Sequence, residues 1–238
     1  MKLVVGNFKM NLLKDDILLY LDSLNDSKMT FSNVVFCPPH IYLSEFINRG
    51  YTVGSQDISM EEGGPYTGDV SARQLKSIGV TYAIIGHSER RKFYNDNRYV
   101  SKKIKMCCDN GLVPILCIGE NQNDYNNAQT KNILMHEIDE ALEGVLNINN
   151  LYIAYEPIWA IGSGIIPCID EIDDIVKFIK EYVYNKYRFN IKVLYGGSVS
   201  LKNIDKLLKI NSIDGYLVGG ESLNSIKFCQ LISKINKI

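Results

Sequence analysis

Eight short runs rich in β-branched and other apolar residues recur along the chain, and each is followed by a longer segment with helical spacing. The runs cover residues 2–7, 33–37, 51–55, 81–86, 112–118, 151–156, 192–195 and 215–218. Strands that alternate with helices form βαβ units, whose strands pair in parallel. Eight such units predict a closed α/β barrel of eight parallel strands surrounded by helices, whereas six or fewer would form an open sheet.

Two helices stand out between the runs. Residues 132–146 and 170–184 each place apolar residues at helical spacing on one side. Asp170 and Glu171 begin the second segment, where the helix dipole favours negative charge. The length of 238 residues suits one barrel, and no linker or change of composition divides the chain. We therefore expect a single domain over residues 1–238.

Charge and composition exclude several classes of function. The net charge is −1, and the basic residues are scattered, so no surface is predicted to bind nucleic acid. No run approaches the ~18 apolar residues of a membrane span, and no signal sequence is evident, which predicts a cytoplasmic protein without membrane contact. The six cysteines form no C-x-x-C motif and the three histidines lie far apart, so we expect no metal site.

Polar residues follow several of the predicted strands. Asn7 and Lys9 come at the end of the first, His87 after the fourth and Glu156 after the sixth. The loops after the strands of a parallel barrel share one face, so these residues are predicted to be neighbours. Any one of them alone could be an ordinary structural or solvated side chain, but together they form a candidate catalytic set.

Glycine-rich turns follow the last two strands. Gly196-Gly197-Ser198 and Gly219-Gly220 can expose backbone N–H groups that bind a phosphate dianion. Either pair alone is as easily explained by the positive φ of a tight turn. Both pairs on the last two strands of a barrel predict a phosphate site, because that is the usual phosphate position in this fold.

Glu156 and His87 have surroundings that suit acid–base chemistry. Glu156 precedes Pro157, Ile158 and Trp159, apolar groups that can exclude water from a general base. His87 precedes the polar start of a helix, whose dipole is expected to keep the imidazole neutral and able to stabilise an oxyanion. A purely structural histidine remains the alternative for His87.

A segment rich in small residues follows the proposed base, and its glycines suggest a hinged lid rather than an ordinary surface turn. A lid would exclude water from a bound ligand. The predicted lid comprises Pro157, Ile158, Trp159, Ala160, Ile161, Gly162, Ser163, Gly164, Ile165, Ile166 and Pro167.

Five segments, in order along the whole chain, resemble the triosephosphate isomerase family. They are residues 7–11 (NFKMN), 86–91 (GHSERR), 154–164 (AYEPIWAIGSG), 194–199 (LYGGSV) and 214–220 (DGYLVGG). The resemblance implies a (β/α)8 TIM barrel that interconverts dihydroxyacetone phosphate and D-glyceraldehyde 3-phosphate in glycolysis and gluconeogenesis. It implies an enediolate intermediate and neither cofactor nor metal.

The same resemblance implies a role for each matching residue. Glu156 would be the base and neutral His87 the electrophile, with Asn7 and Lys9 contacting the substrate. Gly162, Ser198, Gly219 and Gly220 would bind the phosphate through backbone N–H groups. Glu89 and Ser88 would contact the catalytic residues rather than the substrate, with Glu89 close to Lys9.

The segment of residues 56–71 lacks a hydrophobic period and is predicted to be an extended loop. In the family such a loop enters the neighbouring subunit. The resemblance therefore implies a homodimer, with Gln56, Tyr66 and Thr67 in the dimer loop and Thr67 reaching the partner's active site.

The chain departs from the family pattern at a few positions. Asp57 stands where Asn is usual, Glu221 where Ala commonly follows the last glycine pair, and Ile165-Ile166-Pro167 at the far end of the lid. Another phosphate-binding barrel enzyme and a non-catalytic binding barrel are the alternative functions, since a fold alone does not determine chemistry. The combination of Glu156, His87 and Lys9 argues against both.

Overall fold

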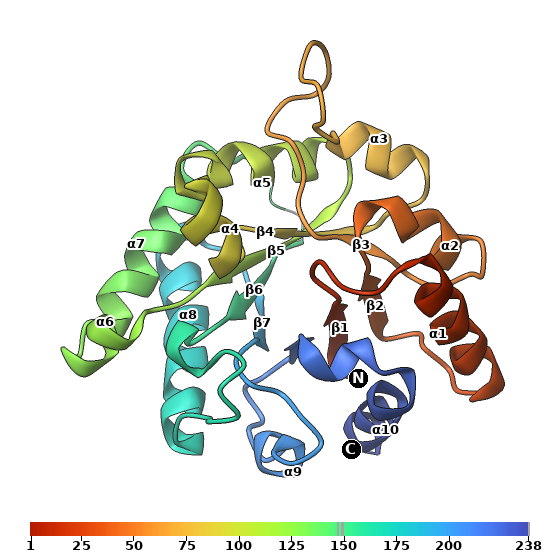
Figure 1. Ribbon diagram of the computed structural model, residues 1–238. Helices are drawn as coiled ribbons and strands as arrows, with labels where there is room; N and C mark the ends of the chain where they lie inside the picture. Colours follow the sequence, from red (N-terminus) through yellow and green to blue (C-terminus); the bar gives the residue numbers. More distant parts are fainter. Residues whose placement is uncertain (147, 149, 238) are drawn as a thin grey trace.

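The computed structural model describes residues 1–146, 148 and 150–237. Within those residues, eight parallel strands form a sheet in the order β2-β1-β8-β7-β6-β5-β4-β3 (Figure 1). A bridge between Phe36 and Val53 brings the two ends of the sheet together, so the barrel is nearly closed. The prediction of an α/β barrel of eight parallel strands is confirmed.

The observed strands lie within the eight predicted runs. They are β1 (Leu3–Asn7), β2 (Val34–Cys37), β3 (Gly54–Ser55), β4 (Tyr82–Ile85), β5 (Val113–Ile118), β6 (Tyr152–Tyr155), β7 (Lys192–Tyr195) and β8 (Gly215–Val218). The largest difference is at β3, which was predicted to begin at residue 51 and begins at Gly54.

Helices surround the sheet on its outer side (Figure 1). The α-helices are α1 (Lys14–Asp26), α2 (Leu43–Ile47), α3 (Ala72–Ser77), α4 (Ser88–Tyr94), α5 (Val100–Asp109), α6 (Gln122–Asn126), α7 (Thr130–Leu142), α8 (Ile169–Tyr187), α9 (Ile204–Leu207) and α10 (Ser225–Asn236). Short 3-10 helices are η1 (His40–Tyr42), η2 (Asp96–Tyr99), η3 (Ile158–Ala160) and η4 (Gly220–Leu223).

The two predicted helices correspond to α7 and α8, but the predicted end of the first was wrong. α7 ends at Leu142, and Gly144 has a φ of 67°, which breaks the helix before Leu146. Leu146 is accordingly 76% exposed. α8 extends slightly beyond the predicted segment at both ends and buries the apolar side expected from its sequence.

The core has two layers because successive strand residues point to opposite sides of the sheet. Inside the barrel a small cluster includes Val5, Ile115, Leu194 and both Cys37 and Cys117. A larger cluster fills the space between the sheet and the helices. Burial raises the pKa of the Cys117 thiol well above its usual value, so this cysteine acts as a small apolar side chain.

The segment of residues 56–71 contains no helix or strand and projects beyond α3 as a long loop (Figure 1). This confirms the predicted extended loop. In the described part of the chain, no helix has both the length and the apolar character needed to cross a membrane.

Candidate active site

The predicted catalytic residues converge at the carboxyl ends of three strands. Asn7 is the last residue of β1, His87 lies two residues after β4, and Glu156 directly follows β6. Together with Lys9 they line one cavity of about 420 Å³. Residues scattered over most of the sequence thus face a common space, as the parallel topology requires.

The predicted phosphate-binding residues line the same cavity. Gly162, Ser198, Gly219 and Gly220 all face it, and Gly219 and Gly220 lead from β8 into η4. Exposed lysines Lys202 and Lys227 also line this cavity, together with Glu221. The cavity lining therefore combines glycines with three lysines, a composition that suits a small anion.

His87 and Glu156 are both buried and close together. Nε2 of His87 lies 3.3 Å from Oε1 of Glu156. The backbone N–H of Glu156 donates to the carbonyl oxygen of Ile118 at 2.8 Å, which attaches the start of the lid to β5. One carboxylate oxygen of Glu156, Oε2, is buried without a hydrogen-bond partner among the described residues.

Two influences act on the imidazole of His87. Burial lowers its pKa, but the charge of Glu156 and the hydrogen bond to it outweigh burial, so the pKa is raised overall. The N–H of Glu89 donates to Nδ1 at 3.2 Å, because His87 is the N-cap of α4. An accepting Nδ1 places the proton of the neutral ring on Nε2. The hydrogen bond at Nδ1 thus favours the neutral form, and the pairing with Glu156 opposes it.

Lys9 is fixed by contacts at both ends of the residue. Its Nζ lies 2.6 Å from Oε1 of Glu89, and its N–H donates to Oδ1 of Asn7 at 3.0 Å. Its carbonyl oxygen accepts from Nε2 of Gln56 at 2.8 Å. These contacts stabilise the left-handed backbone of Lys9, whose φ of 52° is unfavourable for a residue with a side chain. The ammonium group is consequently held at the mouth of the cavity.

Two glycines make room for Glu156. A Cβ on Gly119 would overlap the carbonyl oxygen of Glu156, and a Cβ on Gly196 would lie 2.9 Å from its Cγ. Only residues without a side chain fit these positions. Gly196 belongs to a predicted motif, whereas Gly119 was missed, although it directly follows the fifth predicted strand.

The first part of the lid is anchored by Glu120, a fully buried residue that sequence reasoning also missed. Its Oε1 accepts from Nε1 of Trp159 at 2.9 Å and from the Tyr155 hydroxyl at 3.3 Å. Its carbonyl oxygen accepts from the N–H of Ile158 at 3.0 Å. Burial raises the pKa of the Glu120 carboxyl. The position after the fifth strand was the available signal, because polar residues at strand ends face the site.

The remainder of the lid has mostly local contacts. The hydroxyl of Ser163 donates to the carbonyl oxygen of Ala160 and accepts from the N–H of Ile165. Ile161, Gly162 and Gly164 reach the active-site cavity. Within the described residues, Trp159 thus makes the principal side-chain hydrogen bond from the lid to the barrel.

Part of the lid lies outside this cavity, and so do the predicted supporting and dimer-loop residues Ser88, Glu89, Gln56, Tyr66 and Thr67. Ser88 begins α4 and lines a separate cavity of about 680 Å³ with Ile158 and Ile161. Tyr66 and Thr67 lie on the projecting loop, and Tyr66 is 44% exposed. Their predicted roles involve a second subunit and are taken up below.

A barrel of eight parallel strands, with a buried His–Glu pair in a cavity lined by glycines and lysines at the strand ends, defines an enzyme of the (β/α)8-barrel class. The family model described as triosephosphate isomerase matches residues 2–235, and the chain belongs to the triosephosphate isomerase family.

Similar proteins agree with this assignment. The triosephosphate isomerase of Buchnera aphidicola subsp. Baizongia pistaciae is 38% identical, with 98% of each chain covered. That of Orientia tsutsugamushi strain Ikeda is 38% identical, with 98% of this chain and 97% of the relative covered. The crystal structure of triosephosphate isomerase from Bartonella henselae superposes with a TM-score of 0.88 at 29% identity, over 100% of this chain and 99% of that one.

Proposed function

We propose that this chain interconverts dihydroxyacetone phosphate and D-glyceraldehyde 3-phosphate, with Glu156 as base and His87 as electrophile. The observation that carries the proposal is the His87–Glu156 pair, 3.3 Å apart, inside a cavity that also contains glycine-rich anion-binding turns. Membership of the family supports the substrate. The reaction belongs to glycolysis and gluconeogenesis, and we propose a cytoplasmic location and a single domain over residues 1–238.

The chemistry moves one proton between adjacent carbons and one between the oxygens attached to them. Glu156 removes a proton from the carbon next to the carbonyl group and returns it to the former carbonyl carbon. His87 donates a hydrogen bond from Nε2 to the carbonyl oxygen, whose negative charge develops as the enediolate forms. His87 then gives this oxygen its proton and takes one from the neighbouring hydroxyl group, so the carbonyl and hydroxyl groups exchange places and the imidazole is restored. A substrate between the two residues separates them, which breaks their hydrogen bond and weakens the influence of Glu156 that raises the pKa of His87. Because only protons move, the steps require neither a redox cofactor nor a metal.

The rest of the cavity supplies binding and orientation. Lys9 and Asn7 contact the reacting end of the substrate, while Gly162, Ser198, Gly219 and Gly220 bind its phosphate through backbone N–H groups. Glu89 restrains Lys9 through their 2.6 Å ion pair. Closure of the segment from Pro157 to Pro167 excludes water from the enediolate.

The decisive experiment compares the wild-type enzyme with Glu156→Gln in a coupled assay using glyceraldehyde 3-phosphate. General-base catalysis is worth about 10² to 10⁴ in rate. The kcat of Glu156→Gln should therefore fall at least about 10²-fold, while its melting temperature changes little. Glu143→Gln, at an exposed position, serves as the control and should keep full activity. Near-normal turnover by Glu156→Gln would show that Glu156 is not the catalytic base.

We also propose that the protein is a homodimer in which the loop of residues 56–71, including Gln56, Tyr66 and Thr67, contacts the partner. Large apolar side chains are exposed around this loop and beside Lys9: Met10, Leu13, Tyr66, Phe93 and Tyr94. A groove of about 390 Å³ between the loop and α4 adjoins Tyr94. Exposed apolar groups of this size indicate a protein interface, and a small cavity of about 140 Å³ beside Lys9 and Glu89 could receive Thr67 of the partner.

Sedimentation of the wild-type protein and of Thr67→Arg tests the dimer. The added bulk and charge should dissociate the dimer and lower activity at protein concentrations where the wild type is dimeric. Lys131→Arg, on α7 far from the loop, is the control. A fully active wild-type monomer would contradict the proposed assembly.

A further inference from the structure

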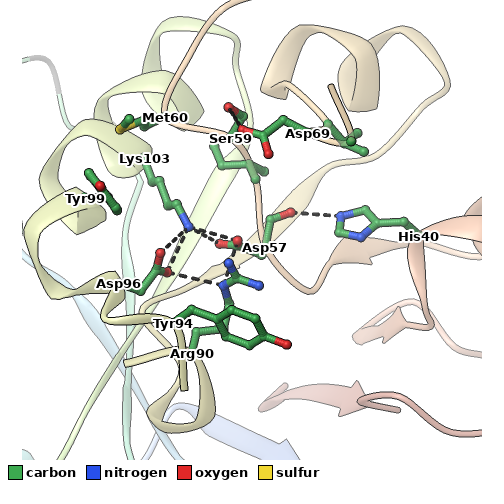
Figure 2. A pocket seen from close by; sticks show the side chains of 13 residues that line it. His40, Asp57, Ser59, Met60, Asp69, Arg90, Tyr94, Asp96, Tyr99 and Lys103 are labelled. Carbon is green, nitrogen blue, oxygen red and sulfur yellow. Dashed lines mark hydrogen bonds and ion pairs between the residues drawn. The ribbon is translucent and has the colours of Figure 1, made fainter. Parts of the chain in front are cut away.

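Figure 2 shows a cluster of four charged side chains, Asp57, Arg90, Asp96 and Lys103. Two of them, Asp57 and Arg90, line a small cavity together with Lys9 and His87 of the candidate active site. Nζ of Lys103 contacts both carboxylate oxygens of Asp57 at 2.8 and 2.9 Å and both of Asp96 at 2.8 Å. Nε of Arg90 lies 2.7 Å from Oδ2 of Asp57 and 3.3 Å from Oδ2 of Asp96. Two positive and two negative groups make the cluster neutral.

Asp57, Asp96 and Lys103 are buried, the Arg90 side chain is 34% exposed, and the cluster joins three parts of the fold. Asp57 belongs to the loop of residues 56–71, Arg90 to α4, and Asp96 and Lys103 to η2 and α5. Lys103 and Asp96 are only 4% and 3% exposed, and Asp57 is 9% exposed. Charges at this depth are strongly destabilising unless each has a partner. Without Asp57, the positive groups would outnumber the negative ones by one.

Asp57 is directly connected to the segment that carries Lys9. The preceding residue, Gln56, donates from Nε2 to the carbonyl oxygens of Lys9 and Cys37 at 2.8 and 2.9 Å. On the other side, Nε2 of His40 lies 2.9 Å from the carbonyl oxygen of Asp57. The backbone at Asp57 is therefore held between β2 and the loop that follows β1.

The other partner of Asp57 leads to His87. Arg90 lies in the first turn of α4, and its N–H donates to the carbonyl oxygen of His87 at 2.8 Å. The cavity of about 140 Å³ is lined both by the catalytic candidates Lys9 and His87 and by Asp57 and Arg90. The Asp57–Arg90 contact thus joins the supports of two residues that face the substrate.

We infer that Asp57 is a positioning residue, whose ion pair with Arg90 fixes the distance between the Lys9 segment and the His87 turn. The inference deepens the proposed isomerase function and rests on it. Asp57 has two separable effects. Its charge neutralises Lys103, which stabilises the folded protein, and its ion pair with Arg90 attaches the loop to α4, which maintains the geometry of the catalytic residues. Misplacement of catalytic groups by about 1 Å can lower turnover about 10²-fold.

The central variant is Asp57→Asn, which keeps the shape of the side chain and removes its charge. We expect kcat to fall about ten- to hundredfold and the melting temperature to fall by several degrees. In the double variant Asp57→Asn/Lys103→Met, Arg90 and Asp96 remain as a neutral pair, and an apolar group replaces the buried ammonium. The melting temperature should then recover while kcat stays low, because the ion pair with Arg90 is still missing.

A second readout does not depend on turnover. The chain has three histidines, so the imidazole NMR signals of His87 can be assigned by comparison with His87→Gln. Asp57→Asn should shift these signals. Asp214→Asn is the matched control at the opposite end of the barrel, where Asp214 binds the N–H of Val193 and Nζ of Lys180. It should lower the melting temperature without changing kcat or the His87 signals.

Clear outcomes would overturn the inference. One is an Asp57→Asn protein with kcat within about twofold of wild type and unchanged His87 signals, measured where sedimentation shows the same oligomeric state. Another is recovery of kcat together with stability in the double variant, which would assign Asp57 to stability alone. If Asp57→Asn does not fold, Arg90→Gln breaks the same contact and must show the same loss. An inactive wild type would instead refute the proposed function, while the NMR comparison still tests the positioning.

Discussion

Nε2 of His87 points at Oε1 of Glu156 across 3.3 Å, although the two residues follow strands β4 and β6, which are separated by β5. Each residue has a backbone contact of its own: the N–H of Glu89 donates to the imidazole, and the N–H of Glu156 donates to the Ile118 carbonyl oxygen. The two side chains are therefore adjacent in the ligand-free protein, and they must move apart to admit a substrate between them.

Replacing His87 by Gln should lower kcat about 10²- to 10³-fold, because loss of one preorganised oxyanion donor costs about 3–4 kcal/mol. Steady-state kinetics checks this. His136→Gln is the control, since His136 is exposed on α7 and its side chain is 69% accessible. Equal losses in both variants, or none in His87→Gln, would exclude the proposed role of His87.

Replacing Gly119 by Ala should destabilise the protein and impair catalysis together. The new Cβ would overlap the carbonyl oxygen of Glu156, and a backbone atom cannot move aside cheaply. We expect a loss of about 1–3 kcal/mol in the free energy of unfolding and a lower kcat. Gly63→Ala is the matched control, because a Cβ there meets nothing within 4 Å. Thermal unfolding and kinetics of both variants decide the matter, and a fully active, stable Gly119→Ala would refute the steric argument.

Glu120 should make stability depend on pH. Burial raises its pKa above the ordinary value of 4.5, so the folded state binds the proton more tightly than the unfolded state. The resulting stabilisation is present below about pH 4.5 and is lost as the pH rises through the folded pKa. In Glu120→Gln this titration is absent. Its melting temperature relative to wild type should therefore rise steadily from pH 4 toward neutral pH.

The matched control for this pH experiment is Glu143→Gln, at an exposed position just after α7. Its melting-temperature difference from wild type should be flat over the same range. Asp57 and Glu137, whose pKa values are also raised by burial, are present in every protein compared, so their titrations cancel. A flat difference for Glu120→Gln as well would show that Glu120 titrates normally.

Local sequence patterns predicted the strands well, because a buried parallel strand is a short apolar run regardless of its neighbours. The end of α7 was less predictable. Val145 and Leu146 continue the apolar spacing beyond Leu142, and the positive φ of Gly144 is a conformational choice that the pattern does not encode. The 3-10 helices and short helices such as α6 and α9 also carry too few residues to show a period.

The candidate site was predictable where a residue follows a strand, which places His87, Glu156 and Ser198 on one face without knowledge of any contact. Contacts between distant segments were not. Nothing local to Glu120 indicates Trp159 as its partner, and nothing local to Asp57 indicates Arg90 or Lys103. Such pairs depend on how helices pack against the barrel, so they became visible only in three dimensions.

Trp159 is the only tryptophan in the chain, and its indole sits on the lid with its N–H bonded to Glu120. Excitation at the long-wavelength edge of protein absorption selects tryptophan. The fluorescence excited there therefore comes from Trp159 alone, with no background from the barrel. The enzyme thus carries a built-in optical probe of the segment proposed to cover its substrate. The proposed opening and closing can be timed in the unmodified protein, without a dye or an engineered label.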